Sequence, residues 1–239
     1  MMAADAAPGT AWPRFTPVGD HALLVSLGDT LTDATSAAVM ALDQALTLAP
    51  PPGVSECVPA LVNLLVEFDP LLTDHHQVRM QVQRLLLRAA QAPREGQLRE
   101  VEVCYDDGLA PDLAAVAQAS GLGVDAVIAC HLQADYVVRM FGFAPGYAYL
   151  SGVPPAIQVP RKPSAVRGIP AGSVLIAGPQ CLVTTLSMPT GWSIIGRSPT
   201  RILTPDDRVP VLFAVGDRVR FTRIDQALYT QRLAHPHRD

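Results

Sequence analysis

Beyond Asp135 the chain consists of short apolar runs separated by glycine and proline, and this pattern is the strongest constraint on its fold. The runs lie at 136–140, 173–177, 193–195, 211–213 and 218–221. Several short strands with regular turn signals are typical of a small β-barrel or sandwich. Two short helices, at 112–119 and 124–132, are predicted to precede this all-β region.

The first hundred residues have a different pattern. Alternating apolar runs predict strands at 21–27, 54–58, 61–68 and 99–105, while apolar residues at helical spacing predict helices at 32–48 and 74–91. The resulting order β-α-β-β-α-β is that of a ferredoxin-like sandwich. We therefore predict an α+β protein with a loose tail at 1–14, a ferredoxin-like domain at 15–107, a barrel domain with leading helices at 108–228, and a tail at 229–239.

Composition narrows the class of function. Hydrophobic residues make up 49% of the 239 residues, which is enough for packed cores, and the net charge of −4 is spread along the chain without basic clusters. Nucleic-acid binding is therefore not expected. The N-terminus lacks the basic and apolar regions of a signal peptide, and no apolar run reaches the roughly 18 residues of a membrane span. A cytoplasmic protein without membrane contact is the expectation.

The four cysteines, Cys57, Cys104, Cys130 and Cys181, are far apart in the sequence. Close ligand pairs are usual for zinc, and disulfide frameworks are usual in short secreted chains. We expect four free thiols and no metal site.

The first of three glycine- and proline-rich segments reads FGFAPGYAYL and ends at Leu150. Its glycines permit unusual backbone angles, and such a loop can bring N–H groups close to an anion. A tight barrel turn with inward-packed aromatics is the purely structural alternative, and the pattern alone favours it. The candidate binding residues are Gly142, Phe143, Ala144, Pro145, Gly146 and Tyr149.

The second segment contains VPRK, ending at Lys162, and IPAGS, ending at Ser173. Arg161, Lys162 and Arg167 are cations in a region poor in charge, and arginine grips carboxylates or phosphates through paired hydrogen bonds. Gly172 and Ser173 suit a ligand-binding turn, with Ser173 as a catalytic candidate, although the GxSxG elbow of a hydrolase is missing. Solvated surface cations and a plain turn explain the segment equally well.

The third segment is PTGWSIIGR, in which Trp192 and Arg197 are candidates for the walls of a pocket. His131, at the end of a predicted helix, is a candidate acid or base because its usual pKa lies near neutrality, although a cap or packing role is more common. No Walker loop, HExxH, GxGxxG or Ser-His-Asp spacing is present. The residues by themselves indicate a pocket for a small anion.

These segments resemble the KipI / allophanate hydrolase subunit 1 family. GFAPGYAYL, VPRK, IPAGSVLIAG and GWSIIGR occur in the family's order and spacing, and VGDHALLVSLGD near the N-terminus is similar to its opening. The resemblance runs from about residue 15 to residue 224. It implies an N-terminal α+β domain followed by a cyclophilin-like β-barrel.

For function, the resemblance implies the B subunit of an ATP-dependent 5-oxoprolinase that cleaves 5-oxoproline to glutamate. The implied partners are the A and C subunits of that enzyme, of which the second is itself a barrel protein, and the chain is expected to be inactive alone. No cofactor is expected to bind it directly, with ATP used by the complex. The family also implies two alternatives, an inhibitor of a histidine kinase and a component of an allophanate- or urea-type carboxyltransferase-hydrolase.

Two positions depart from the family's pattern. Thr184 stands where the family commonly has tyrosine, and Thr190 where it has glycine. A lost tyrosine ring reshapes a pocket wall, and threonine restricts a loop that glycine leaves free. These departures affect the prediction of the substrate more than the prediction of the fold.

Overall fold

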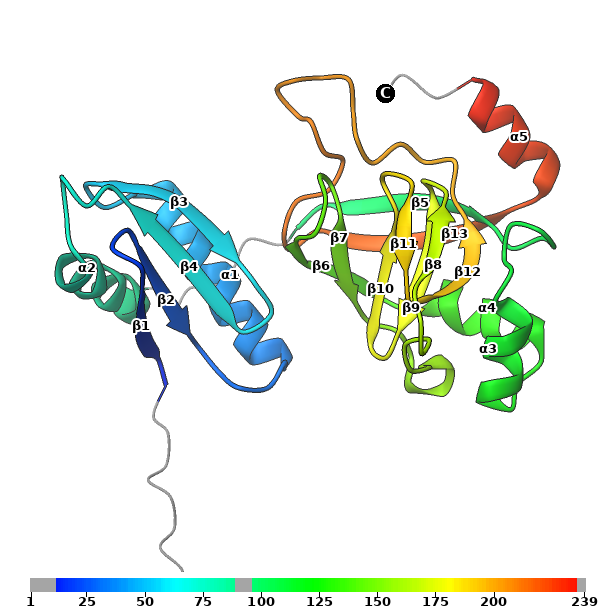
Figure 1. The fold of residues 1–239 in the computed structure, drawn as a ribbon, viewed down its shortest axis with the longest axis horizontal. Coiled ribbons are helices and arrows are strands. Elements are labelled where there is room, and N and C mark those ends of the chain that lie inside the picture. Colours follow the sequence, from blue (N-terminus) through cyan, green and yellow to red (C-terminus); the bar gives the residue numbers. More distant parts are fainter. Residues whose placement is uncertain (1–11, 89–95, 236–239) are drawn as a thin grey trace, which may run out of the picture. The chain divides into compact units, whose positions relative to one another are not determined.

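The computed structural model describes residues 12–88 and 96–235 (Figure 1). Most of the predicted tail at 1–14 therefore lies outside the described residues. The chain divides into two compact units, Met1–Arg94 and Glu95–Asp239. No single helix in the described ranges is long and apolar enough to cross a membrane, and the pair formed by 113–120 and 124–133, which passes on length and composition, is bent by 93°.

The N-terminal unit is a four-stranded antiparallel sheet with two helices on one face (Figure 1). Its elements are β1 (Arg14–Val18), β2 (Ala22–Ser26), α1 (Asp33–Leu48), β3 (Val54–Pro59), β4 (Asn63–Phe68) and α2 (His75–Arg88). The sheet order is β1-β2-β4-β3. Alternate residues of β2 and β4 point inward and meet Leu42 and Leu46 of α1 and Val78 and Val82 of α2 in one apolar core.

Helix α1 begins where the sequence supplies a cap. The Thr32 hydroxyl accepts a hydrogen bond from the Thr35 N–H at 3.0 Å, and Asp33 places a negative charge in the first turn. The helix ends before the Pro50–Pro52 run, which cannot continue it.

The ferredoxin-like order β-α-β-β-α-β predicted for this unit is not confirmed, because its elements run β-β-α-β-β-α. The strand β5 (Leu98–Cys104) was expected to complete the N-terminal sheet, but it pairs in parallel with β13 (Arg218–Ile224) in the C-terminal unit. One edge of the N-terminal sheet is formed by β1, which pairs with β2 and which the alternation had not predicted. The boundary between the two units therefore falls near residue 94 rather than at 107, because an alternating pattern predicts a strand but not its partner.

The C-terminal unit contains a closed barrel, as the short strands predicted, with the order β10-β7-β6-β13-β5-β12-β9 within residues 96–235. The remaining barrel strands are β6 (Tyr136–Phe141), β7 (Ala148–Ser151), β9 (Ser173–Ala177), β10 (Gln180–Val183) and β12 (Ser193–Arg197). Strands β8 (Val166–Ile169) and β11 (Met188–Thr190) form a separate pair. Helices α3 (Leu113–Ser120) and α4 (Val124–Gln133) and the 3-10 turn η1 (Pro155–Ile157) complete this part.

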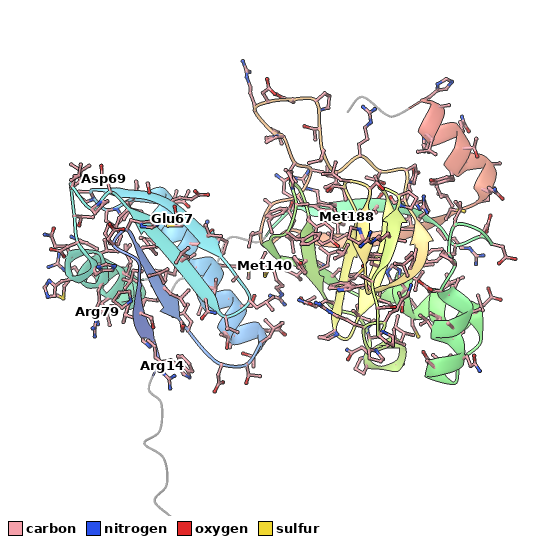
Figure 2. The ribbon with its side chains drawn as sticks, viewed as in Figure 1. Arg14, Glu67, Asp69, Arg79, Met140 and Met188 are labelled. Atoms are coloured by element: carbon pink, nitrogen blue, oxygen red, sulfur yellow. The ribbon has the colours of Figure 1, made fainter. Side chains whose placement is uncertain are left out.

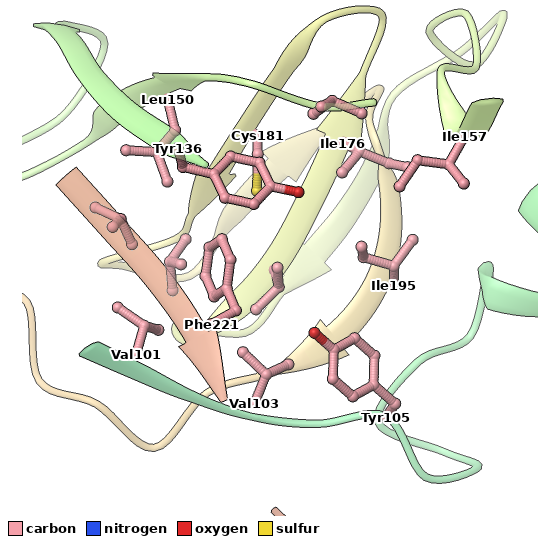
Figure 3. Close-up of a cluster of buried hydrophobic side chains, with 14 of the residues drawn as sticks. Val101, Val103, Tyr105, Tyr136, Leu150, Ile157, Ile176, Cys181, Ile195 and Phe221 are labelled. Atoms are coloured by element: carbon pink, nitrogen blue, oxygen red, sulfur yellow. The ribbon is translucent and has the colours of Figure 1, made fainter. Parts of the chain in front are cut away.

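The barrel interior is a packed core and not a channel. Figure 3 shows aliphatic and aromatic side chains from different strands meeting there, and Val101, Tyr136, Ile176, Ile195 and Phe221 are all at most 2% exposed. Helices α3 and α4 contribute their apolar faces to the same cluster. This interior fixes the strands whose turns carry the candidate site.

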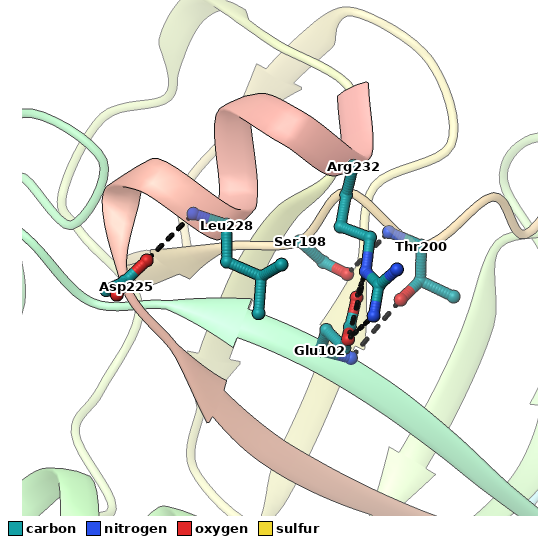
Figure 4. A network of polar contacts seen from close by, with 6 residues as sticks. All are labelled: Glu102, Ser198, Thr200, Asp225, Leu228 and Arg232. Atoms are coloured by element: carbon teal, nitrogen blue, oxygen red, sulfur yellow. Dashed lines mark hydrogen bonds and ion pairs between the residues drawn. The ribbon is translucent and has the colours of Figure 1, made fainter. Parts of the chain in front are cut away.

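The predicted C-terminal tail also needs correction, because residues 226–234 form helix α5 (Gln226–Ala234). The Asp225 carboxylate caps it by accepting the Leu228 N–H at 2.7 Å (Figure 4). Arg232 forms an ion pair with Glu102 of β5 at 3.0 Å. A helix therefore covers part of the barrel where we had predicted loose chain.

Candidate functional site

The FGFAPGY segment forms the turn of the β6–β7 hairpin. Within it Gly142 N–H donates to the Tyr147 carbonyl, Ala144 N–H to the Gly142 carbonyl, and Tyr147 N–H to the Ala144 carbonyl. Gly146 has φ 68°, and a Cβ there would lie 2.7 Å from Leu203 Cδ2, so this position requires glycine. The N–H groups of Phe143 and Gly146 donate to no acceptor in the described ranges.

Phe143 is unusual in this turn. Its φ of 73° is costly for a bulky residue, and its side chain is 73% exposed. The ring lies 5.5 Å from the ring of Tyr147 and does not reach the barrel interior. Tyr147 is 5% exposed but belongs to a cluster separate from the barrel interior, so neither ring packs into that interior.

A series of neighbouring aromatic rings connects this hairpin with Arg161. Tyr147 lies 5.6 Å from Tyr149, and Tyr149 lies 6.0 Å from Trp192, between ring centroids. The Arg161 guanidinium stands over the Trp192 ring at 5.4 Å. Burial raises the pKa of Tyr147 to about 12, and Arg161 opposes part of that rise. The structure thus brings Arg161 to the hairpin through a cluster that also contains Met188 of β11 (Figure 2).

Lys162 is held by a residue that the sequence analysis missed. Its Nζ lies 2.5 Å from Asp112 Oδ2, and the same carboxylate oxygen accepts the Ile194 N–H at 2.7 Å. The Lys162 N–H also donates to the Gly191 carbonyl at 2.7 Å. Lys162 therefore fixes its segment, which leaves Arg161 as the exposed cation of the pair. A lone aspartate at the start of a predicted helix carried no signal for this contact.

The PAGS turn is joined to the hairpin by two threonines. The Gly172 N–H donates to the Thr184 carbonyl at 2.7 Å, and the Ser173 N–H donates to the Thr184 hydroxyl at 2.9 Å. The next hydroxyl, that of Thr185, donates to the Pro145 carbonyl at 2.7 Å. The first two glycine-rich segments thus meet at one rim of the barrel.

Ser173 does not fit the role of a nucleophile. It is 0% exposed, and its hydroxyl donates to the Pro170 carbonyl at 2.8 Å. Its N–H and that of Gly172 are already bonded to Thr184, so neither is free to stabilise an oxyanion. The PAGS turn supports the rim and offers no reactive group.

His131 does not fit the role of an acid or base either. It is 0% exposed inside the barrel, with its ring 4.5 Å from that of Phe221. Nδ1 lies 2.7 Å from the Tyr105 hydroxyl and Nε2 lies 3.7 Å from Cys181 Sγ. Burial lowers the pKa of His131 to about 3, so the ring is neutral at physiological pH. His131 is a packing residue of the core.

The remaining candidates are separated. Trp192 and Arg197 stand near opposite ends of β12, which places their backbones roughly 15 Å apart at the usual strand rise. They do not form two walls of one small pocket. Arg167 is exposed on β8, and no ion pair engages it within the described ranges. Arg161 and the hairpin are the parts of the predicted set that lie together, and within the hairpin Phe143 and Pro145 are exposed whereas Gly146 is buried.

The cysteines take no part in this site. All four are free thiols, and burial raises the pKa of Cys57 to about 11. Within residues 12–88 and 96–235 no group of three or more histidine, cysteine, aspartate and glutamate side chains is arranged to hold a metal ion.

The barrel architecture and these segments define a carboxyltransferase-type domain. The family model "carboxyltransferase domain, subdomain C and D" matches residues 13–213, and the chain belongs to this family. The resemblance inferred from the sequence motifs is thereby confirmed. The chain is 35% identical to the B subunit of 5-oxoprolinase from Bacillus subtilis (strain 168) over 223 residues, which are 89% of this chain and 93% of that relative.

Solved structures agree with this assignment. The protein TTHA0988 is 33% identical and superposes with a TM-score of 0.77 over 86% of this chain, which spans 40% of that longer protein. The urea amidolyase of K. lactis superposes with a TM-score of 0.74 over 92% of this chain and 15% of its own, at 14% identity. The second likeness concerns the fold alone.

Proposed function

We propose that this chain is the B subunit of a cytoplasmic, ATP-dependent 5-oxoprolinase that opens 5-oxoproline to glutamate together with its A and C subunits. Curated relatives from Bacillus subtilis and Escherichia coli, at 35% and 32% identity, are named as the B subunit of 5-oxoprolinase. Nucleotide contact is assigned to a partner, because this sequence has no Walker-type phosphate loop. The kinase-inhibitor and urea-type alternatives remain predictions.

The observation that carries the proposal is Arg161 over Trp192 beside the β6–β7 hairpin. A guanidinium held on an aromatic face keeps its planar fork available for a carboxylate, which 5-oxoproline supplies. The unbonded N–H group of the exposed Phe143 is a donor for the oxygen of an amide that gains negative charge as the ring opens. In this proposal Arg161 binds the substrate, and the hairpin stabilises the developing oxyanion.

The test uses the complex co-expressed with its partner subunits, with ATP-dependent release of glutamate from 5-oxoproline as the readout. Arg161→Ala is expected to lower kcat/KM by about 10- to 100-fold, which corresponds to the roughly 1.5–3 kcal/mol of a charged hydrogen-bonded pair. Arg220→Ala, at an exposed arginine of β13, is the matched control and should leave turnover unchanged.

Arg161→Lys separates charge from geometry. A lysine keeps the positive charge but loses the fork, so turnover between that of the wild type and that of Arg161→Ala is expected. Unchanged turnover in Arg161→Ala, with the complex intact by gel filtration, would refute the assigned role. An intact complex that releases no glutamate from 5-oxoproline at all would refute the proposed activity itself.

A further inference from the structure

Helix α5 lies against the barrel with few anchoring contacts. Of its residues Tyr229 is buried, whereas Leu228 and Arg232 are half-buried and the others are exposed. Tyr229 packs with Cys104 and Ile224 in a small separate cluster. Further ties are the Arg232–Glu102 ion pair (Figure 4), the Gln226 N–H, which donates to Asp106 at 3.1 Å, and a side-chain hydrogen bond between Tyr229 and Arg197. An element with so little buried surface opens more readily than the barrel strands.

Beneath this helix lies Arg197, the last residue of β12. Its backbone pairs with Ser173 of β9 and Cys104 of β5, and its Cδ would lie 3.5 Å from a Cβ placed on Gly172. Tyr229 of α5 is its neighbour, where burial raises the pKa of the phenol and the Arg197 guanidinium opposes the rise through its charge and a side-chain hydrogen bond to the phenol. This neutral phenol is the partner that α5 gives the arginine, and it does not satisfy Nε. The arginine, which is half-buried, thus lies between the rim of the barrel and one aromatic side chain of the helix.

The Nε of Arg197 is buried and has no hydrogen-bond acceptor among the described residues. Other half-buried arginines of this unit do have carboxylate partners. Arg99 pairs with Asp217 at 2.9 Å and Arg232 pairs with Glu102 at 3.0 Å. A buried guanidinium N–H without an acceptor is costly, so its persistence points to a counter-ion that binds from outside the chain.

We propose that Arg197 is the cationic centre of a binding site for a small oxyanion, and that α5 closes this site through Tyr229 when no anion is bound. The ligand class is a carboxylate or a phosphate group, because both present paired oxygens that match the guanidinium fork. Tyr229 then acts as a removable cover whose displacement exposes the arginine. This site is independent of Arg161 and does not require 5-oxoproline to be the substrate.

Calorimetric titration of the full chain at low ionic strength tests the proposal, with inorganic phosphate and 5-oxoproline as separate probes. The probe that binds with the higher affinity shows whether the site prefers a phosphate or a carboxylate. Tyr229→Ala removes the cover and is expected to bind the tighter probe about tenfold more tightly than the wild type, as when a closed state dominates the free protein. In the wild type, saturating anion is expected to raise hydrogen exchange of the α5 amides.

Arg197→Gln in the Tyr229→Ala background is expected to weaken this binding at least about tenfold. Arg220→Gln in the same background is the control for non-specific charge and should bind as before. If the glutamine variant does not fold, as judged by Trp192 fluorescence in a Trp12→Phe background, Arg197→Lys replaces it and should bind several-fold more weakly.

Three results would overturn the proposal. Tyr229→Ala could bind neither probe, or it could bind a probe with the same affinity as the wild type. The third such result is that substitution of Arg197 leaves the affinity unchanged. None of these measurements involves the partner subunits or turnover. A failure here is therefore distinguishable from a failure of the proposed 5-oxoprolinase activity.

Discussion

The buried histidine makes the barrel sensitive to acid. Inside the barrel His131 is fully buried, and burial lowers its pKa to about 3. In the unfolded chain a histidine titrates near its usual pKa of about 6.5. Between these two values the unfolded state binds a proton that the folded state excludes, so the free energy of unfolding falls as the pH falls through this window. Above about pH 7 the effect disappears.

The size of the effect follows from the same two values. Each pH unit below the unfolded pKa costs about 1.4 kcal/mol, so a change from pH 7 to pH 5 removes about 2 kcal/mol through His131 alone. His131→Gln removes the titrating group while it keeps an amide that can hydrogen-bond with Tyr105. The variant is expected to lose about 2 kcal/mol less stability than the wild type between these pH values.

Urea unfolding at pH 7, 6 and 5 measures this difference. In a Trp12→Phe background the fluorescence of Trp192, which is 5% exposed in the C-terminal unit, reports on the barrel. Other titrating groups act equally in both proteins and cancel in the comparison. Parallel loss of stability in the wild type and His131→Gln would refute the reasoning, because it would mean that His131 is protonated in the folded barrel.

Three further predictions concern the rim of the barrel and are measured by the same urea titrations. Gly172→Ala is expected to lower the free energy of unfolding by more than about 2 kcal/mol, because φ is 80° there and a Cβ would lie 2.3 Å from the Ser198 carbonyl oxygen. Gly178→Ala, at φ 52° with no neighbour within 4 Å, should lower it by about 1 kcal/mol. Similar losses in the two variants would contradict the close approach at Gly172. Thr184→Val should cost about 1–3 kcal/mol, since it leaves the Ser173 N–H without its acceptor, and a neutral result would show that this N–H finds another partner. Phe143→Gly should stabilise the barrel by about 1 kcal/mol by relieving a positive φ, and a loss of stability would show that the exposed ring contributes packing.

The sequence was informative wherever local pattern decides structure. Alternation and turn residues predicted most of the strands, and the Pro50–Pro52 run correctly ended α1. The spacing of glycine and proline also identified the β6–β7 hairpin and the PAGS turn, which the structure joins through Thr184 and Thr185. These features depend on backbone conformation, and glycine and proline report backbone conformation directly.

Pairing between distant segments was not predictable from pattern. The strand at 98–104 has the alternation of any half-buried strand, and nothing in it indicates that its partner lies 120 residues further on, in Arg218–Ile224. His131 was considered as an acid or base because histidine titrates near neutrality, but its burial in α4 depends on Tyr136 of β6 and Phe221 of β13. Trp192 and Arg197 were grouped by sequence proximity, which in an extended strand means separation.

The two departures from the family's pattern gain a physical meaning from their contacts. Thr184 is 1% exposed, and its hydroxyl accepts the Ser173 N–H while it donates to the Pro170 carbonyl at 2.8 Å. A tyrosine hydroxyl lies too far from its backbone to make both contacts, so a chain with tyrosine here must satisfy this turn differently.

Thr190, the last residue of β11, has a comparable role. Its hydroxyl accepts the Trp192 N–H at 3.1 Å, and so it helps to hold the ring that carries Arg161. Both threonines are therefore scaffold residues, one for the rim and one for the arginine. Both side chains are buried, so either threonine affects a ligand only through the position of the hairpin or of Trp192.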